Sequence, residues 1–150
     1  MTVRINGERQ VDAPPERVYA ALTDPEVVMK SVPLVQRLDV KDADHWDVVV
    51  KVPMPLAPAL TLSFEVVERR APEHAKLRAG GGGMVGGADV VSTFDLTEQA
   101  GGTLVRFHAE LTFRGALAGL ERMLEPVAKR QSEKTLDAIE EHAGGAERQR

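Results

Sequence analysis

Strict alternation of apolar and polar residues dominates the start of the chain. Val3, Ile5 and Val11 share one side of this pattern with Gly7 and Arg9, and polar residues stand between them. A period of two is typical of a strand that buries one face. We therefore predict a strand over residues 3–11, with Arg9 as the charged exception on its buried side.

The pattern then changes to that of two short helices. The segment DAPPERVYAAL places Val18 and Leu22 on one stripe, and its prolines are tolerated in a first helical turn. The segment PEVVMK follows Thr23 and Asp24, either of which can cap a second helix. Pro33 is predicted to end it.

Period-two alternation returns in six segments between residues 37 and 113. The sequences KDAD, PMPLAP, RAPEH, a glycine run and EQAGG separate them. One side of each segment is apolar and the other polar, as in an antiparallel sheet with one covered face. The inward positions are, in chain order, Leu38, Val40, Trp46, Val48, Val50, Val52, Leu60, Leu62, Phe64, Val66, Ala75, Leu77, Ala79, Val90, Ser92, Phe94, Leu96, Val105, Phe107, Ala109, Leu111 and Phe113.

A helical period begins after Gly115. We predict a helix to about His142, stopped by the glycines at 144 and 145 and kinked or split at Pro126. It is the one segment long enough to cover the sheet, which predicts a single α+β domain over residues 1–143 and a short flexible tail over 144–150. Its stripe consists of Leu117, Leu120, Leu124, Val127, Gln131, Thr135 and Ala138.

Composition narrows the function classes. The 150 residues include no cysteine and carry a formal charge of −4, which excludes disulfides and thiolate chemistry and argues against nucleic acid as a partner. No apolar run approaches the roughly 18 residues of a spanning helix, and the N-terminus has no apolar signal core. We therefore expect a soluble, cytoplasmic protein.

Sequence motifs for catalysis or cofactor binding are not convincing. Gly81, Gly83 and Gly86 form a GxGxxG pattern, but a strand pattern follows it, whereas a phosphate-binding loop needs a helix there. We interpret the run as a hairpin or bulged strand end, or as a flexible cavity lip with Gly83, Met84 and Val85. The histidines lack metal-ligand spacing and no GxSxG motif is present. We predict no metal, no cofactor and no catalytic residue.

Polar residues on the buried stripes are the more informative candidates. Arg9, Ser92 and Gln131 must each pair internally, reach solvent or meet a ligand. They are either satisfied core groups, or residues assigned to the wrong face, or the groups that orient a polar ligand head. The apolar residues around them would line a cavity or simply fill a core, namely Trp46, Val48, Leu62, Phe64, Leu77, Phe94, Phe107, Leu120, Leu124 and Val127.

A proline-rich segment interrupts the strands. Met54 and Leu56 lie among Pro53, Pro55 and Pro58. They form either an exposed apolar lip for a partner or membrane surface, or a rigid hairpin tip that folds back on the sheet.

The order of strand, two short helices, six strands and one long helix resembles the helix-grip fold of the START, birch-pollen-allergen and polyketide cyclase (SRPBCC) superfamily. The segments INGERQVDAPPERVYAALTDPEVVMKSVP, GGGGMVGGADV and GGTLVRFHAELTFRGALAGL are most similar to the branch named after the G subunit of carbon monoxide dehydrogenase. The resemblance implies about seven curved antiparallel strands wrapped on the long helix, with a hydrophobic cavity between them. It also implies a role beside a molybdenum hydroxylase, in quinone handling or enzyme maturation.

Two departures from that branch change the expectation. The connection VPMPLAPAL is unusually apolar, and the chain stops soon after the helix, where members of the branch often continue into a linker and an anchoring tail. We expect at most peripheral membrane contact, at the inner face through a partner. The leading hypothesis is a non-catalytic protein that binds a quinone- or lipid-like molecule. The alternatives are a polyketide cyclase/dehydrase-like enzyme and an interaction module using the proline-rich lip.

Overall fold

Seven antiparallel strands form one continuous sheet in the computed structural model, which describes residues 2–30, 35–51, 59–84 and 86–148. The elements are, in chain order, β1 (Thr2–Val11), α1 (Pro15–Leu22), α2 (Pro25–Lys30), β2 (Val35–Asp42), β3 (His45–Val50), β4 (Leu60–Arg70), β5 (His74–Gly83), β6 (Gly86–Gln99), β7 (Gly102–Gly115), the 3₁₀ helix η1 (Ala116–Leu120) and α3 (Glu121–Arg148). Across the sheet the strands lie in the order β1-β7-β6-β5-β4-β3-β2.

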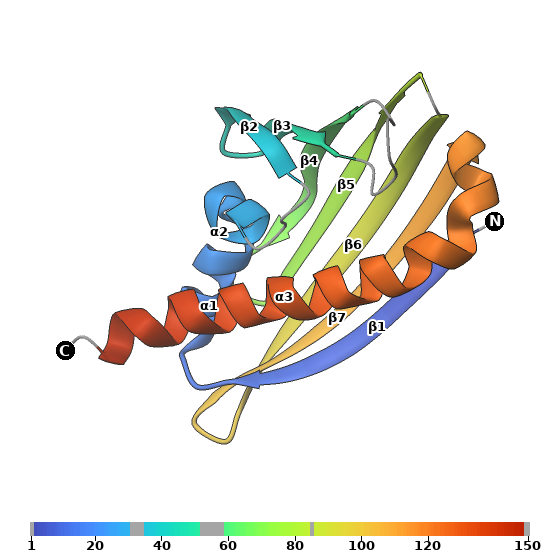
Figure 1. Ribbon diagram of the computed structural model, residues 1–150. Coiled ribbons are helices and arrows are strands. Elements are labelled where there is room, and N and C mark those ends of the chain that lie inside the picture. Colours follow the sequence, from blue (N-terminus) through green and yellow to red (C-terminus); the bar gives the residue numbers. More distant parts are fainter. Residues whose placement is uncertain (1, 31–34, 52–58, 85, 149–150) are drawn as a thin grey trace.

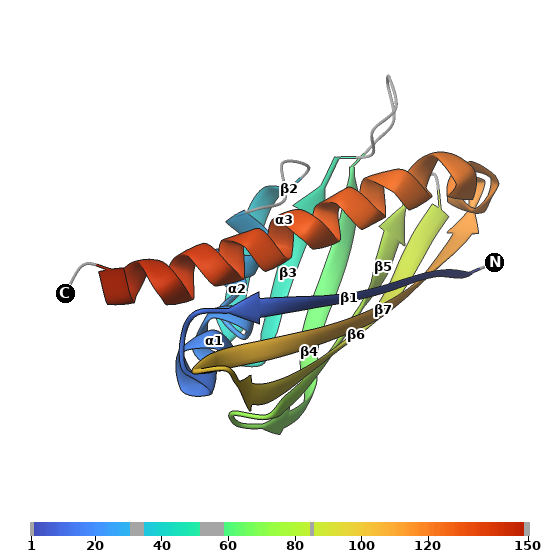
Figure 2. The ribbon, with the colours of Figure 1, turned by 90° about the horizontal axis from the view of Figure 1, so that it is seen from below.

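The sheet curves and presents its concave face to α3 (Figure 1). Figure 2 shows α3 lying across this face, with α1 and α2 at one end of the sheet. The concave face is apolar because alternate residues of each strand point toward it, so that it must be covered. This arrangement confirms the predicted helix-grip fold with its seven strands, its long C-terminal helix and two short helices after the first strand.

Local capping explains the break between α1 and α2. The hydroxyl of Thr23 donates to the carbonyl oxygen of Tyr19 at 2.8 Å, at the end of α1. The carboxylate of Asp24 accepts a hydrogen bond from the backbone N–H of Glu26 at 3.0 Å, at the start of α2. Of the two predicted caps of the second helix, Asp24 therefore takes this role.

The predicted end of the long helix at His142 is wrong. α3 runs through Gly144 to Arg148, so residues 144–148, predicted as tail, belong to the helix. Glycine in a helix costs about 1 kcal/mol relative to alanine, but each residue added to a formed helix also adds a hydrogen bond. Pro126 lies inside α3, so the helix is not split there.

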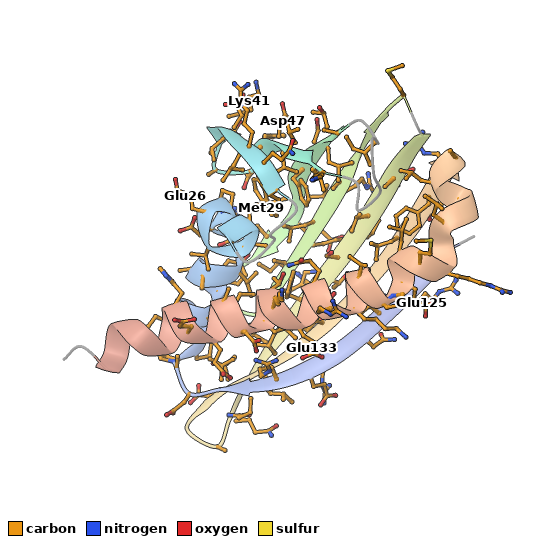
Figure 3. The ribbon with its side chains drawn as sticks, viewed as in Figure 1. Glu26, Met29, Lys41, Asp47, Glu125 and Glu133 are labelled. Carbon is orange, nitrogen blue, oxygen red and sulfur yellow. The ribbon has the colours of Figure 1, made fainter. Side chains whose placement is uncertain are left out.

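Charged residues occupy the outer face of the sheet. Arg4 on β1 pairs with Glu110 on β7 at 3.3 Å. Lys41 and Asp47 lie 3.9 Å apart on the β2–β3 hairpin, pointing away from α3 (Figure 3). Val40, predicted to point inward, is 46% exposed because β2 is an edge strand. Charged side chains of the outer face thus pair with one another across neighbouring strands.

Candidate functional site

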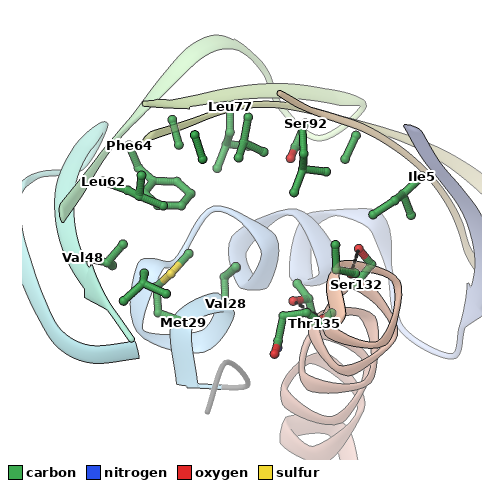
Figure 4. A pocket seen from close by; sticks show the side chains of 18 of the residues that line it. Ile5, Val28, Met29, Val48, Leu62, Phe64, Leu77, Ser92, Ser132 and Thr135 are labelled. Carbon is green, nitrogen blue, oxygen red and sulfur yellow. Dashed lines mark hydrogen bonds between the residues drawn. The ribbon is translucent and has the colours of Figure 1, made fainter. Parts of the chain in front are cut away.

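A cavity of about 290 Å³ lies between the concave face of the sheet and the helices α2 and α3. Figure 4 shows its walls: Leu62, Phe64 and Leu77 point down from the sheet, while Val28 and Met29 reach up from α2. The interior is therefore hollow in this region, which decides between the two alternatives that the sequence leaves open.

Small side chains in the middle of the sheet create this space. Phe64 is followed across the sheet by Ala79 and Val90, and Leu77 is followed by Ser92 and Ala109. An alanine or a serine reaches only a short way above the sheet, so α3 cannot be contacted there. Close packing is the norm in protein interiors, and these positions are where the sequence departs from it.

Aromatic rings border the cavity on the sheet. The rings of Phe94 and Phe107 lie 5.1 Å apart and tilted by 42° at one end. Phe64 lies toward the β3 side and stacks on Trp46, with centroids 5.7 Å apart. Phe64, Phe94 and Phe107 line the cavity, and Trp46, which lies beside Phe64 on the neighbouring strand, does not. Ring faces and edges of this kind suit flat apolar ligands.

A few neutral polar groups interrupt the apolar lining. Gln131, Ser132 and Thr135 come from one side of α3, and Ser92 comes from β6. The Ser132 hydroxyl donates to the carbonyl oxygen of Ala128 at 3.0 Å, and the Thr135 hydroxyl donates to that of Gln131 at 2.9 Å. The Ser92 hydroxyl has no hydrogen-bond partner within the described parts of the chain. Hydroxyls without a full set of partners can bond a ligand.

The structure brings ten of the thirteen predicted lining residues to this cavity. They come from β3 to β7 and from α3, which share one interior in the fold. The ten are Val48, Leu62, Phe64, Leu77, Ser92, Phe94, Phe107, Leu124, Val127 and Gln131.

Arg9 lies away from the cavity, although it points to the inner side as predicted. Its guanidinium donates to Asp137 at 2.6 Å and to Glu133 at 3.2 Å, both on α3. The hydrogen bond from Arg9 to Asp137 is the largest cause of the raised pKa of Arg9. The placement follows from topology, because β1 is an edge strand beside α3. Internal pairing, one of the two interpretations of this residue, thus accounts for it.

Trp46 and Leu120 also lie outside the cavity lining. Trp46 is buried, and its indole nitrogen has no acceptor within the described residues. Leu120 belongs to η1, where it packs with Leu60, Leu117 and Phe113 in a separate small cluster. The apolar pattern of the sequence predicts both as lining residues, because it gives the side to which a residue points and not its distance from the cavity.

The predicted lip is only partly described. Gly83 and Met84 lie at the end of the β5–β6 hairpin and do not line the cavity, and the Met84 side chain is 93% exposed. Met54, Leu56 and Val85 fall outside the described residues.

The glycine run allows backbone conformations and close contacts that this hairpin requires. Gly81 and Gly86 have φ values of +150° and +129°, which other residues rarely adopt. A Cβ at Gly81 would come within 2.2 Å of the Thr61 carbonyl oxygen. The run passes from one strand into the next rather than into a helix, which matches the interpretation as a hairpin.

Sequence reasoning misses several lining residues. Val28 and Met29 on α2 cannot be assigned to a face, because their orientation depends on how α2 docks on the sheet. Ser132 lies beside the predicted stripe, one helical turn after Ala128. Its spacing from Leu124 and Ala128 is a signal that could place it there.

The histidines lie on the outer side of the molecule. His74 contacts Asp95 through Nδ1 at 2.7 Å and Glu68 through Nε2 at 3.0 Å. His45 contacts Asp42 at 2.8 Å. Within the described ranges, no group of three His, Asp or Glu side chains is arranged to hold a metal ion. These two histidines therefore act as hydrogen-bond partners of carboxylates on the outer face.

Fold and cavity together define a helix-grip protein of the SRPBCC superfamily. The chain belongs to the family described as "Polyketide cyclase / dehydrase and lipid transport", whose profile matches residues 2–144. No curated protein sequence matches the chain. In the described part of the chain, the helices lack the length and apolar content that crossing a membrane requires.

Several solved structures share the fold. A conserved protein from Geobacillus kaustophilus is 21% identical with a TM-score of 0.82, and 97% of each chain is covered. Ara h 8.0201 is 15% identical with a TM-score of 0.71, covering 97% of this chain and 99% of that one. The di-domain ARO/CYC StfQ from the steffimycin biosynthetic pathway is 12% identical with a TM-score of 0.68, covering 97% of this chain and 52% of that one. At these identities the likeness extends to the fold alone.

Proposed function

We propose that this protein binds a hydrophobic small molecule, quinone- or lipid-like, between its sheet and α3, without transforming it. The observation that carries the proposal is the cavity of about 290 Å³ with its almost wholly apolar lining. Ligand pockets generally have volumes of roughly 300–1,000 Å³ and combine apolar walls with a few polar groups. The cavity suits a compact ligand at the lower end of that range.

The energetics favour occupancy. Transfer of apolar surface from water gains about 25 cal/mol per Å², so burying on the order of 200 Å² of ligand gives about 5 kcal/mol before the cost of association. The described walls are preformed by the curved sheet and α3, which reduces the cost of ordering them. The family description, which includes lipid transport, supports the same role.

A non-catalytic role is supported by the chemistry of the interior. The polar groups there are an amide and hydroxyls, from Gln131, Ser132, Thr135 and Ser92. General acid–base catalysis uses a group whose pKa lies near the working pH, which these neutral groups do not offer. The charged residues at its border, Lys51 and Arg78, are exposed.

The resemblance to the G subunit of carbon monoxide dehydrogenase supports a more specific role as an accessory protein of a molybdenum hydroxylase in the cytoplasm. The ligand would then be a quinone-like molecule. Affinity capture of the tagged protein from its native host tests this part. Recovery of a molybdopterin-containing dehydrogenase supports it, and capture without any such enzyme contradicts it while leaving ligand binding unaffected.

Native mass spectrometry followed by organic extraction tests the binding role. We expect the purified protein to carry an apolar molecule or to take one up. The variant Ala109→Phe fills the middle of the cavity and should carry none. Ala43→Phe makes the same change in the exposed turn between β2 and β3 and should bind as the wild type does. A wild-type protein that neither carries nor accepts any apolar molecule would contradict the proposal.

A second candidate is a cyclase/dehydrase-like enzyme, which the family description and the cluster of Gln131, Ser132 and Thr135 in an apolar cavity favour. Turnover of a β-polyketone, followed by chromatography, tests it. Turnover that disappears in Gln131→Leu but persists in Arg9→Gln would support the enzyme, because Arg9 lies outside the cavity. An unchanged substrate would exclude this activity for the compound used.

A further inference from the structure

Hydroxyl groups face the cavity from two opposite walls. Ser132 and Thr135 come from α3, and Ser92 comes from β6 across the space (Figure 4). Nearly all other side chains around the space are apolar. Burying a polar ligand atom without a hydrogen bond is costly, so these hydroxyls and the amide of Gln131 determine which polar atoms a ligand can place inside.

The Ser132 hydroxyl is committed as a donor. It gives its hydrogen to the carbonyl oxygen of Ala128 at 3.0 Å, and a carbonyl oxygen can only accept. A hydroxyl has one hydrogen and two lone pairs. The capacity that Ser132 retains toward the cavity is therefore that of an acceptor.

Ser92 on the opposite wall differs from Ser132. Its hydroxyl has no partner within the described residues, so it can donate to a ligand or accept from it. Ser92 on the sheet can thus bond a ligand donor or a ligand acceptor, while Ser132 on the helix favours a ligand donor. A ligand carbonyl or ether oxygen at Ser132 would need that hydroxyl to give up its bond to the α3 backbone.

We infer that the cavity, in the binding role proposed above, prefers apolar ligands whose O–H or N–H group donates to the hydroxyl oxygen of Ser132. The inference rests on the proposed function and adds the chemical class: phenols, alcohols or reduced quinones rather than ethers, ketones or oxidised quinones of the same shape. The Ser132–Ala128 hydrogen bond stays intact when such a ligand binds.

Two probes of nearly equal shape test this preference: 2-naphthol, which has a donor, and 2-methoxynaphthalene, which has none. Isothermal titration calorimetry gives the affinity of each for the wild type, Ser132→Ala, Ser92→Ala and Ser63→Ala. Ser63 lies on β4 outside this cavity and is the control for the substitution itself. Circular dichroism shows whether each variant is folded.

One hydrogen bond changes affinity about 2- to 10-fold. We expect the wild type and Ser63→Ala to prefer 2-naphthol by this factor. Ser132→Ala should weaken this preference, because the phenol then loses one acceptor in the cavity wall.

Three results would overturn the inference, and the last is distinguishable from the first two. Equal affinities in the wild type, or a preference that Ser132→Ala retains and Ser92→Ala abolishes, would contradict the role of Ser132 while leaving the binding function standing. Binding of neither probe to the folded wild type would contradict the proposed function as well.

Discussion

The two halves of α3 contact the rest of the protein in different ways. In the C-terminal half, Leu136, Ile139 and Ala143 are at most 4% exposed. In the N-terminal half, Leu124 and Val127 are only half-buried and line the cavity. One helix thus forms a packed end and a hollow end.

The difference arises in the surfaces that face the helix. At the packed end the core cluster includes Val11, Val18 and Ala21, all at most 1% exposed, from β1 and α1. At the hollow end the sheet presents Ala79, Ala88 and Ala109, which are too short to reach the helix. The stripe predicted on α3 therefore identifies the side of the helix that faces the cavity, and the opposing residues decide whether the contact is dense.

The largest effect is expected from truncation at the packed end. Ile139→Ala should lower the free energy of unfolding by about 2–5 kcal/mol, because it opens a void in a dense region. Val127→Ala should cost less than about 1 kcal/mol, since its side chain already borders empty space. Urea unfolding monitored by circular dichroism measures both. Equal losses would contradict the distinction between the two ends.

Enlarging an alanine should likewise destabilise the packed end more than the hollow end. Ala143→Phe at the packed end should destabilise the fold by about 1–3 kcal/mol or more through overpacking. Ala109→Phe has space above it and should cost less, while abolishing uptake of apolar ligand. Thermal unfolding and a ligand titration on each variant check this. Ligand uptake by Ala109→Phe equal to the wild type would place the ligand elsewhere.

Polar substitutions near the two ends of α3 should differ in their effect on ligand affinity. Arg9→Ala removes ion pairs with Asp137 and Glu133, whose side chains are 65% and 70% exposed while that of Arg9 is 21% exposed, so we expect a loss of about 1 kcal/mol and unchanged ligand affinity. Gln131→Leu should leave stability within about 0.5 kcal/mol and change the affinity for ligands with a polar head. Unfolding and binding measurements on both variants test this. A ligand affinity that falls in Arg9→Ala and not in Gln131→Leu would contradict the placement of Gln131 at the ligand and of Arg9 away from it.

The smallest effect is expected at an exposed ion pair distant from both ends. The hydrogen bond with Asp42 raises the pKa of His45 and lowers that of Asp42. The contribution of His45 is present below its unfolded pKa of about 6.5 and is lost as the pH rises through the folded value; that of Asp42 is lost as the pH falls. Thermal unfolding should show that the melting temperature decreases slightly less from pH 5.5 to 8.5 in His45→Gln than in the wild type. The same decrease in both proteins would exclude this linkage.

Alternation along the strands predicts the strands and most cavity walls, whereas the curved sheet wrapped on α3 is what the resemblance to the helix-grip family implies. Val48, Leu62 and Leu77 are placed correctly because strand geometry fixes the side to which each residue points. Arg9 shows the limit, since its inward direction is right but its partner depends on where α3 crosses β1. Val28 shows another limit, because the docking of a short helix is a tertiary property.

Whether the interior is hollow could not be read from the sequence. Ala79, Ala88 and Ala109 are scattered along the chain, and only the strand register places them near one another. Their combined effect depends on the distance to α3, which the curvature of the sheet sets. The same residues under a flatter sheet would have made an ordinary core.

An NMR titration of the ¹⁵N-labelled protein with 2-naphthol tests the hollow end most directly. We predict saturable shifts of backbone amides around the cavity, at Ala109, Ser92 and Ser132, and none at Ile139 in the packed end. Shifts confined to the outer face of the sheet, or the absence of saturable shifts anywhere, would contradict the account.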